Sequence, residues 1–303
     1  MIKPKLIAIT GPSASGKTAL SVNLAQELNG EIISVDSRQI YKELDIGSAK
    51  PSQEERNGIP HHLIDITDVN KNFTAADFCD LAKKVIKDIT ARGKQPILAG
   101  GTGLYYRILL QDFDLPRVAP NEELRAELDK KSSEELHNML KEADYELSQK
   151  IHFNNKVKII RALEVCKTLG IPMSKAQKKK ESEYKTFWIG LNSDNRDFLY
   201  DRINKRVDIM FEQGLLHEAE QLFKKYGKNN ILMNTIGYQE LYPLLKGETD
   251  FESASNLLKQ NTRRYAKRQI SWFKANKDIN WFDIEQQNTK EILSACIEKY
   301  NKL

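Results

Sequence analysis

The chain has 303 residues, of which 40% are hydrophobic and 29% are charged. This composition excludes a disordered chain, and the length fits one large domain or a core with a smaller companion domain. The formal net charge of +5 is too small to identify a binding partner.

Short apolar runs alternate with helical patterns in the first hundred residues. Strands are predicted over residues 5–10, 31–35, 62–66 and 95–100. Helices are predicted over residues 17–28 and from the capping residue Thr74, paired with Asp77, to the stop residue Gly93. Strands that alternate with helices indicate an α/β fold, in which a parallel sheet carries helices on both faces.

The pattern changes near Pro116. Residues 117–150 are polar and helical in character, and helix starts are predicted near Asn121 and Ser132. A further helix is predicted over residues 157–169, because Gly170 and a proline follow it.

Strand character returns at residues 184–191, and the rest of the chain is predicted to be mostly helical. We therefore expect two domains: a core over residues 1–115 and 184–303, and a small all-helical insertion domain over residues 116–183.

No apolar run approaches the ~18–20 residues of a membrane span. The apolar stretch from Leu6 to Thr10 is also shorter than the ~7–15 residues of a secretory signal. We expect a soluble, cytoplasmic monomer that does not bind a membrane. Three scattered cysteines predict free thiols rather than disulfides or a zinc site: Cys79, Cys166 and Cys296.

The strongest motif lies between the first predicted strand and the first predicted helix. It fits the pattern GxxxxGK[ST], in which backbone N–H groups surround phosphate oxygens and the helix N-terminus adds positive charge. Lys17 supplies a full charge, and Thr18 is placed to hold Mg²⁺. The motif predicts a P-loop NTPase-like core whose phosphate-binding residues are Gly11, Pro12, Ser13, Ala14, Ser15, Gly16, Lys17 and Thr18.

Phosphate binding does not identify the reaction. P-loops are typical of nucleotide-binding and ATP-binding proteins, which usually carry an acidic residue at the end of a later strand. Here the strand over residues 95–100 ends in Ala99, Gly100 and Gly101, without a carboxylate. A nucleoside triphosphate is therefore not the only candidate, since any diphosphate ester with Mg²⁺ would fit.

Asp36 follows the second predicted strand. Ligands bind at the C-terminal ends of strands in open α/β sheets, where a carboxylate can act as a base or accept a hydrogen bond from a nucleophile. The same residue type often caps a loop. The spacing leaves both interpretations open.

Residues 256–277 contain no acidic residue and interleave aromatic side chains with seven cations. Such a segment suits an RNA backbone, although a solvated helix face with the aromatics in the core would show the same pattern. The cations are Lys259, Arg263, Arg264, Lys267, Arg268, Lys274 and Lys277.

Several motifs together resemble the tRNA isopentenyltransferase family, the bacterial tRNA dimethylallyltransferases. They occur in the family's order over about residues 5–275. They are the P-loop, Asp36 to Tyr41, Asp45 to Pro51, His61 to Asp65, Gly100 to Tyr105, Arg161 to Val165, Arg202 to Met210, and Gly237 to Glu240.

The resemblance implies a reaction. The family transfers the dimethylallyl group of dimethylallyl diphosphate to N6 of the adenine immediately 3′ of the anticodon in tRNA, releasing diphosphate. By this resemblance Asp36 is the general base, Lys17 and Arg206 hold the diphosphate, Thr102 lies near the site, and Mg²⁺ is the cofactor. Without the resemblance, Arg202 and Arg206 would be read as a charged surface of a helix.

The resemblance also implies contacts with the tRNA anticodon stem-loop, partly through the insertion domain. The residues carried over, together with two from the basic segment, are Asp36, Ser37, Arg38, Gln39, Thr102, Lys158, Arg161, Gly237, Tyr238, Arg263 and Lys267. The chain departs from the family at Asn155, where an acid is usual, and at Lys158, where an arginine is usual. Lysine keeps the charge but loses the bidentate fork of arginine, so the details of loop recognition stay open.

Two other functions remain possible from the residues alone. One is a P-loop small-molecule or nucleotide kinase, and the other is a non-catalytic RNA-binding protein. The missing carboxylate after the strand over residues 95–100 and the acid-free basic segment favour the prenyltransferase.

Overall fold

The computed structural model describes residues 3–110, 116–176 and 182–302. The chain forms two compact units. The larger unit comprises Met1–Tyr106 and Glu183–Leu303, and the smaller unit comprises Arg107–Ser182.

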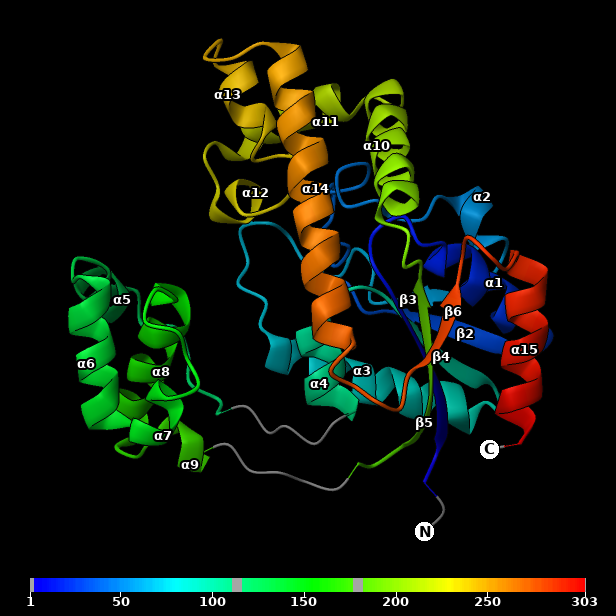
Figure 1. Cartoon of the computed structure of the whole chain (residues 1–303), viewed down its shortest axis with the longest axis horizontal. Helices are drawn as coiled ribbons and strands as arrows, with labels where there is room; N and C mark the ends of the chain where they lie inside the picture. The colour runs from blue at the N-terminus through cyan, green and yellow to red at the C-terminus, as the bar shows by residue number, and fades with distance from the viewer. Residues whose placement is uncertain (1–2, 111–115, 177–181, 303) are drawn as a thin grey trace. The chain divides into compact units, whose positions relative to one another are not determined.

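The larger unit is built on a six-stranded parallel sheet with the strand order β3-β2-β4-β1-β5-β6 (Figure 1). The strands are β1 (Lys5–Thr10), β2 (Gly30–Ser34), β3 (His61–His62), β4 (Gln95–Ala99), β5 (Lys185–Asn192) and β6 (Asn280–Asp283). The central strand β1 is buried from Leu6 onward, as expected for a parallel sheet covered on both faces. The predicted α/β fold is confirmed.

The sequence prediction was wrong about the third strand and missed the last one. Only His61 and His62 pair with β2, because Leu63 and Asp65 take left-handed backbone conformations with φ of 61° and 59°. These angles interrupt an extended strand. β6 pairs with β5 through Trp281 and Phe282, at the edge of the sheet.

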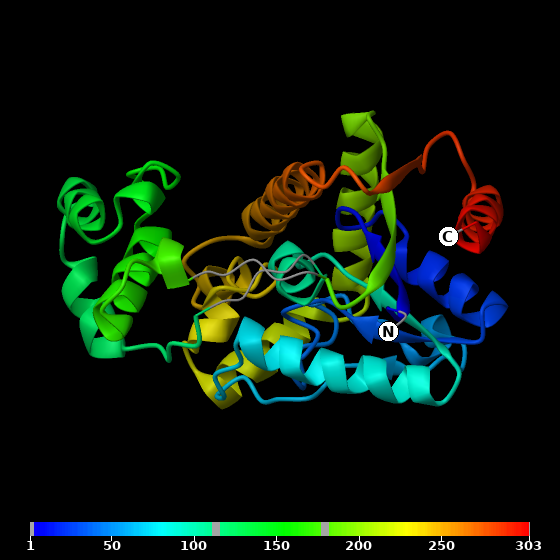
Figure 2. The ribbon, with the colours of Figure 1, turned by 90° about the horizontal axis from the view of Figure 1, so that it is seen from below.

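Helices cover both faces of the sheet (Figures 1 and 2). On one face α1 (Lys17–Glu27) and α15 (Thr289–Asn301) contribute Leu20, Leu24 and Ile292 to a core with the strands. On the other, α3 (Ala75–Ala91) and α4 (Gly103–Leu110) pack together through the stacked rings of Phe78 and Tyr105. The predicted capping box at Thr74 begins α3.

A group of helices lies beyond the C-terminal ends of the strands (Figure 1). They pack against the segment after β2 in a second core that contains Tyr41, Leu44, Val207 and Tyr238. The long helices α10 and α14 run side by side there. The helices are α10 (Arg196–Glu212), α11 (Leu215–Tyr226), α12 (Asn230–Met233), α13 (Leu241–Leu245) and α14 (Phe251–Phe273). A one-turn helix, α2 (Gln53–Arg56), precedes β3.

The described residues of the smaller unit from Pro116 onward form helices without a strand. The helices are α5 (Glu122–Asp129), α6 (Ser133–Ala143), α7 (Tyr145–Ser148), α8 (Lys156–Leu169) and α9 (Met173–Ala176). Asn121 and Ser132 cap α5 and α6 as predicted, and Gly170 ends α8 in a left-handed conformation. Leucine side chains of α5 and α6 pack against Ile159 and Leu163 of α8.

The three cysteines form no disulfide with one another, as predicted, and all three are buried. Within the described part of the chain, no group of three or more His, Cys, Asp or Glu residues could hold a metal ion. No described helix has both the length and the apolar character needed to cross a membrane.

One buried carboxylate fastens the edge of the sheet. Glu31 of β2 accepts hydrogen bonds from Arg92 and from Lys94, at 2.5–2.8 Å, and contacts His62 at 2.7 Å. The hydrogen bonds from Arg92 outweigh the effect of burial and hold the pKa of Glu31 far below its usual range.

We expect Glu31→Gln to lower the free energy of unfolding by about 3 kcal/mol near neutral pH, because cations that are only partly exposed to solvent lose their partner. The folded pKa lies below the unfolded value of 4.5, so this stabilisation is present above about pH 4.5 and is lost as the pH falls towards the folded pKa. Urea denaturation at neutral and acidic pH measures it. Glu27→Gln, at an exposed position of α1, is the control. Equal stabilities of the two variants at neutral pH would contradict the prediction.

Candidate active site

A cavity of about 840 Å³ opens at the C-terminal ends of β1, β2 and β4. Its wall is made by the P-loop, the segment after β2, the segment over residues 47–51, and one face each of α10 and α14. Parallel α/β sheets place their ligand sites at this end of the strands. All of these elements belong to the larger unit.

The P-loop joins β1 to α1 in a conformation that needs its glycines. A Cβ on Gly11 would lie 2.4 Å from the carbonyl oxygen of Leu191, and Gly16 has a left-handed φ of 88°. The turn leads directly into the N-terminus of α1, where unpaired amides and the helix dipole favour an anion.

Lys17 lies across the mouth of this loop. Its Nζ donates hydrogen bonds to the carbonyl oxygens of Gly11 (3.0 Å) and Pro12 (2.6 Å). Burial, together with the nearby charge of Arg206, lowers the pKa of Lys17 from 10.5 to about 7, against the opposing effect of Asp36. The ammonium group is therefore in an environment that favours added negative charge.

Two arginines of α10 approach the same loop from one helix face, four residues apart. Arg202 donates through Nε to the carbonyl oxygen of Ala14 at 2.9 Å. Arg206 lines the cavity, and the described residues offer its guanidinium neither a hydrogen bond nor an ion pair. Burial lowers the pKa of Arg206. A half-buried guanidinium without a partner is suited to bidentate binding of a phosphate group.

Asp36 uses its two oxygens differently. Oδ1 accepts hydrogen bonds from the backbone amides of Arg38 (2.8 Å) and Gln39 (3.4 Å), so the loop-capping interpretation is correct for this atom. Oδ2 makes no hydrogen bond within the described chain, and the half-buried residue lines the cavity. Asp36 can therefore cap its loop and still accept a proton from a ligand.

Thr102 lies behind the loop that carries Asp36. Its Oγ1 accepts a hydrogen bond from the amide of Ser37 at 3.0 Å. The glycine turn before it must lie close to β2, since a Cβ on Gly100 would be 2.2 Å from the carbonyl oxygen of Val35. Thr102 is not among the residues that line the cavity; its contact is with the loop of Asp36.

Gln269 was missed by the sequence prediction. This buried side chain of α14 accepts a hydrogen bond from the amide of Ser13 at 3.0 Å and donates one to the carbonyl oxygen of Gly101 at 3.1 Å. It connects α14 with the P-loop and with the glycine turn. The local sequence shows only a glutamine in a basic helix, because its partners lie more than 160 residues away.

The residues predicted to contact tRNA are divided between the two units. Ser37, Arg38, Gln39 and Gly237 line the cavity with Asp36. Tyr238 has no exposed surface, and its hydroxyl donates to Glu218 at 2.7 Å, so this side chain supports the fold and does not face a ligand.

The two cations named on α14 differ in their surroundings. Arg263 is half-buried and donates to Oδ1 of Asn204 at 2.7 Å, whereas Lys267 is exposed. Lys259 forms an ion pair with Asp208 of α10. The basic segment is therefore partly an interface between helices and partly an exposed cationic surface.

The smaller unit carries the other two predicted contacts, both on α8. Lys158 is exposed in the first turn, where Asn155 caps the helix. Arg161 is paired with the buried carboxylate of Glu164 and donates to the carbonyl oxygen of Val118. Its guanidinium is thus already engaged within the unit.

The donor set at the start of α1 fits a divalent cation. Thr18 and Asp36 both line the cavity, and the hydroxyl of Thr18 makes no hydrogen bond among the described residues. Hydroxyl and carboxylate oxygens, completed by phosphate oxygens of a ligand, are the ligands that Mg²⁺ prefers.

Comparison with known proteins identifies relatives over most of the chain. Residues 39–276 match the family model described as IPP transferase. A tRNA dimethylallyltransferase from Bacillus licheniformis is 47% identical, and the match covers 98% of each chain. One from Alkaliphilus oremlandii is 45% identical over 98% of this chain and 97% of the relative.

Solved structures give the same result. The tRNA delta(2)-isopentenylpyrophosphate transferase of Staphylococcus epidermidis is 42% identical, with a TM-score of 0.74 and coverage of 99% of both chains. A eukaryotic dimethylallyltransferase, described as acting on tRNA, is 30% identical with a TM-score of 0.85. That match covers 98% of this chain and 79% of the eukaryotic one.

We expect inorganic pyrophosphate to bind the cavity and to raise the pKa of Lys17 above its value of about 7 in the free protein. Binding must then take up a proton at Lys17, so the affinity should fall by up to about tenfold per pH unit as the pH rises above 7. Calorimetry in two buffers of different ionisation enthalpy measures the proton uptake. Pyrophosphate itself also titrates, so Lys17→Met provides the baseline. Equal proton uptake by the wild type and this variant would contradict the assignment.

Proposed function

The chain belongs to the IPP transferase family, and from this premise we propose that it transfers the dimethylallyl group of dimethylallyl diphosphate to N6 of the adenine immediately 3′ of the anticodon in tRNA. The observation that supports this most directly is one cavity lined by Lys17, Arg206 and Asp36, in which the carboxylate of Asp36 acts electrostatically on both cations. The cations suit the leaving diphosphate, and the carboxylate suits the incoming amine.

The reaction replaces a carbon–oxygen bond with a carbon–nitrogen bond. N6 of adenine attacks C1 of the dimethylallyl group, the C1–O bond breaks, and the electron pair leaves with diphosphate. The P-loop amides, Lys17 and Arg206 stabilise the charge that develops on the leaving group. Since these groups are in place before the reaction, little reorganisation is needed when the charge appears.

Asp36 acts on the nucleophile, whereas the cations act on the leaving group. The lone pair of the exocyclic amine is delocalised into the adenine ring, so the amine is a weak nucleophile. Oδ2 of Asp36 accepts a hydrogen bond from N6 and takes its proton as the new bond forms. Thr102 holds the same loop through the amide of Ser37.

Mg²⁺ is part of the proposal. Thr18 and the phosphate oxygens would hold it, and it would neutralise charge on the diphosphate. The oxygen donors around the cavity support this choice.

The tRNA is proposed to present its adenine unstacked. A base must leave the stack for its amino group to reach a pocket of this kind, and a single-stranded loop makes this inexpensive. Arg268 on α14 is an exposed cation that lines the cavity, Lys267 is an exposed cation elsewhere on the same helix, and Lys158 is an exposed cation on the smaller unit. We assign the anticodon stem-loop to these surfaces on the basis of their charge.

The central test uses unmodified tRNA and dimethylallyl diphosphate, with a mass gain of C5H8 on one adenosine as the expected product. Asp36→Asn keeps the capping oxygen but removes the base, so we expect kcat to fall by about 10²–10⁴-fold while tRNA binding is retained. Asp278→Asn, at an exposed position, is the matched control. Turnover by Asp36→Asn at the level of this control would refute the role of Asp36.

Binding of tRNA should weaken steeply with salt, because phosphate contacts release counterions. Lys267→Ala should weaken binding and reduce the slope of log K against log salt by about 1. Filter binding or fluorescence anisotropy over a salt series measures this slope. Lys290→Ala on α15, an exposed lysine outside the cavity, should leave it unchanged. Equal slopes for Lys267→Ala and the wild type would remove Lys267 from the interface.

A further inference from the structure

One wall of the cavity is a segment that lacks helix or strand. It runs from Asp45 to Pro51, and Gly47, Ser48, Ala49 and Pro51 line the cavity. Within this segment the amides of Ala49 and Lys50 donate to the carbonyl oxygens of Ile46 and Asp45, whereas the amides of residues 45–47 find their acceptors outside the segment. The acceptors of these amides therefore determine how rigidly this wall of the cavity is held in place.

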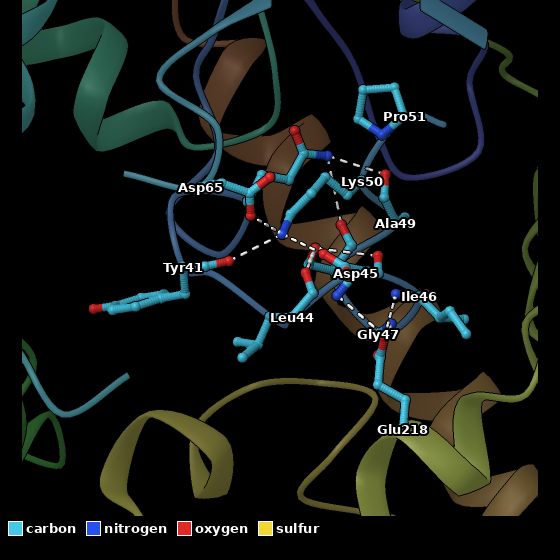
Figure 3. A network of polar contacts seen from close by, with 12 residues as sticks. Tyr41, Leu44, Asp45, Ile46, Gly47, Ala49, Lys50, Pro51, Asp65 and Glu218 are labelled. Atoms are coloured by element: carbon cyan, nitrogen blue, oxygen red, sulfur yellow. Dashed lines mark hydrogen bonds and ion pairs between the residues drawn. The ribbon is translucent and has the colours of Figure 1, made fainter. Parts of the chain in front are cut away.

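The carboxylate of Glu218 supplies them from α11 (Figure 3). Its Oε2 accepts hydrogen bonds from the amides of Asp45 (3.2 Å) and Ile46 (2.8 Å), and its Oε1 accepts one from the amide of Gly47 (2.9 Å). The hydroxyl of Tyr238 donates to Oε1 at 2.7 Å. Three consecutive amides and one hydroxyl thus surround a single carboxylate.

Other side chains hold the wall at its far end. Lys50, whose side chain is 5% exposed, donates to Asp45 and Asp65 at 2.5 Å and to the carbonyl oxygen of Tyr41 at 3.0 Å (Figure 3). Gln39 donates to the carbonyl oxygen of Ala49 at 3.0 Å. The wall is therefore fixed on both sides of Gly47–Ala49.

The packing leaves little freedom at the centre of the wall. A Cβ on Gly47 would lie 2.5 Å from the ring of Tyr238, and one on Gly237 would lie 3.1 Å from the carbonyl oxygen of Gly47. Successive N–H groups around an anion are a strong binding arrangement, and an ionised acceptor gives stronger hydrogen bonds than a neutral one. Without the carboxylate, these donors would lose their acceptor, and the wall could shift.

We propose that Glu218 is a positioning residue for the prenyl transfer, since its carboxylate sets the position of this wall of the cavity that the P-loop also lines, and so the fit of dimethylallyl diphosphate. Small side chains, Ala49 and Pro51, line the cavity on this wall, and Val207 and Met210 of α10 line it as well. This apolar lining suits the five-carbon group. The inference rests on the proposed function, because it concerns the substrate of that reaction.

The test compares Glu218→Gln with Glu220→Gln, an exposed glutamate on the same helix. A glutamine keeps the shape but brings an NH₂ group towards donors that need an acceptor. We expect Glu218→Gln to raise KM for dimethylallyl diphosphate by about tenfold and to lower kcat, with tRNA affinity unchanged. Glu220→Gln should match the wild type in all three quantities. Melting curves show whether each variant is folded at the assay temperature.

A second variant keeps the proposal testable if Glu218→Gln does not fold. Tyr238→Phe removes one of the four hydrogen bonds and leaves the three amides in place, so we expect a smaller rise of KM, about threefold. If Glu218→Gln is folded but has the KM and kcat of Glu220→Gln, the proposal is wrong and Glu218 is only structural. If Glu218→Gln does not fold, the result for Tyr238→Phe decides. A KM for dimethylallyl diphosphate equal to that of the wild type in this variant would overturn the proposal. Failure of the wild type to prenylate tRNA would instead refute the proposed function.

Discussion

The site depends on an imbalance of charge. Lys17 and Arg206 share a cavity in which Asp36 is the carboxylate that raises the pKa of Lys17, and burial lowers the pKa of both cations. Removing cations from water is unfavourable unless an anion accompanies them, and here the protein provides less negative charge than the cavity could accept. The cavity of the free protein therefore favours the binding of a polyanionic ligand. That preference agrees better with a leaving diphosphate than with a purely structural role for the P-loop.

Holding these charges in place requires contacts between distant parts of the chain. Arg202 from α10 binds the carbonyl oxygen of Ala14, and Gln269 from α14 binds the amide of Ser13. Both contacts join the C-terminal half of the chain to the P-loop near its N-terminus. The helices that follow β5 thus do more than bury their own apolar faces. They complete a loop that β1 and α1 begin, so the cavity forms only when both halves of the larger unit have folded.

The features that could be predicted from the sequence are those set by short-range patterns of residues. The P-loop, the capping boxes at Thr74 and Ser132, and most strands follow from residue spacing over fewer than about twenty positions. The interruption after His62 did not, because leucine at position 63 gives no sign of a left-handed angle, and Asp65, a residue type that tolerates this conformation, is not a sufficient signal alone. Glu218 and Gln269 were missed for another reason. The backbone groups that they bind lie more than 160 residues away, and no periodicity encodes such a contact. Tyr238 lies in a motif of the family, yet its complete burial could be seen only in three dimensions.

Asp36 shows why the two sequence interpretations did not exclude each other. A side chain held by Oδ1 to two backbone amides loses rotational freedom, and the second oxygen is then presented in a narrow range of directions. A general base gains from such restraint, because proton transfer needs the acceptor within hydrogen-bond reach of the amine throughout the reaction. The amide bonds also distribute negative charge over the loop without neutralising it, so the carboxylate remains an acceptor. Capping the loop is thus part of what would make Asp36 an effective base, and the same carboxylate serves the fold and the chemistry through different atoms.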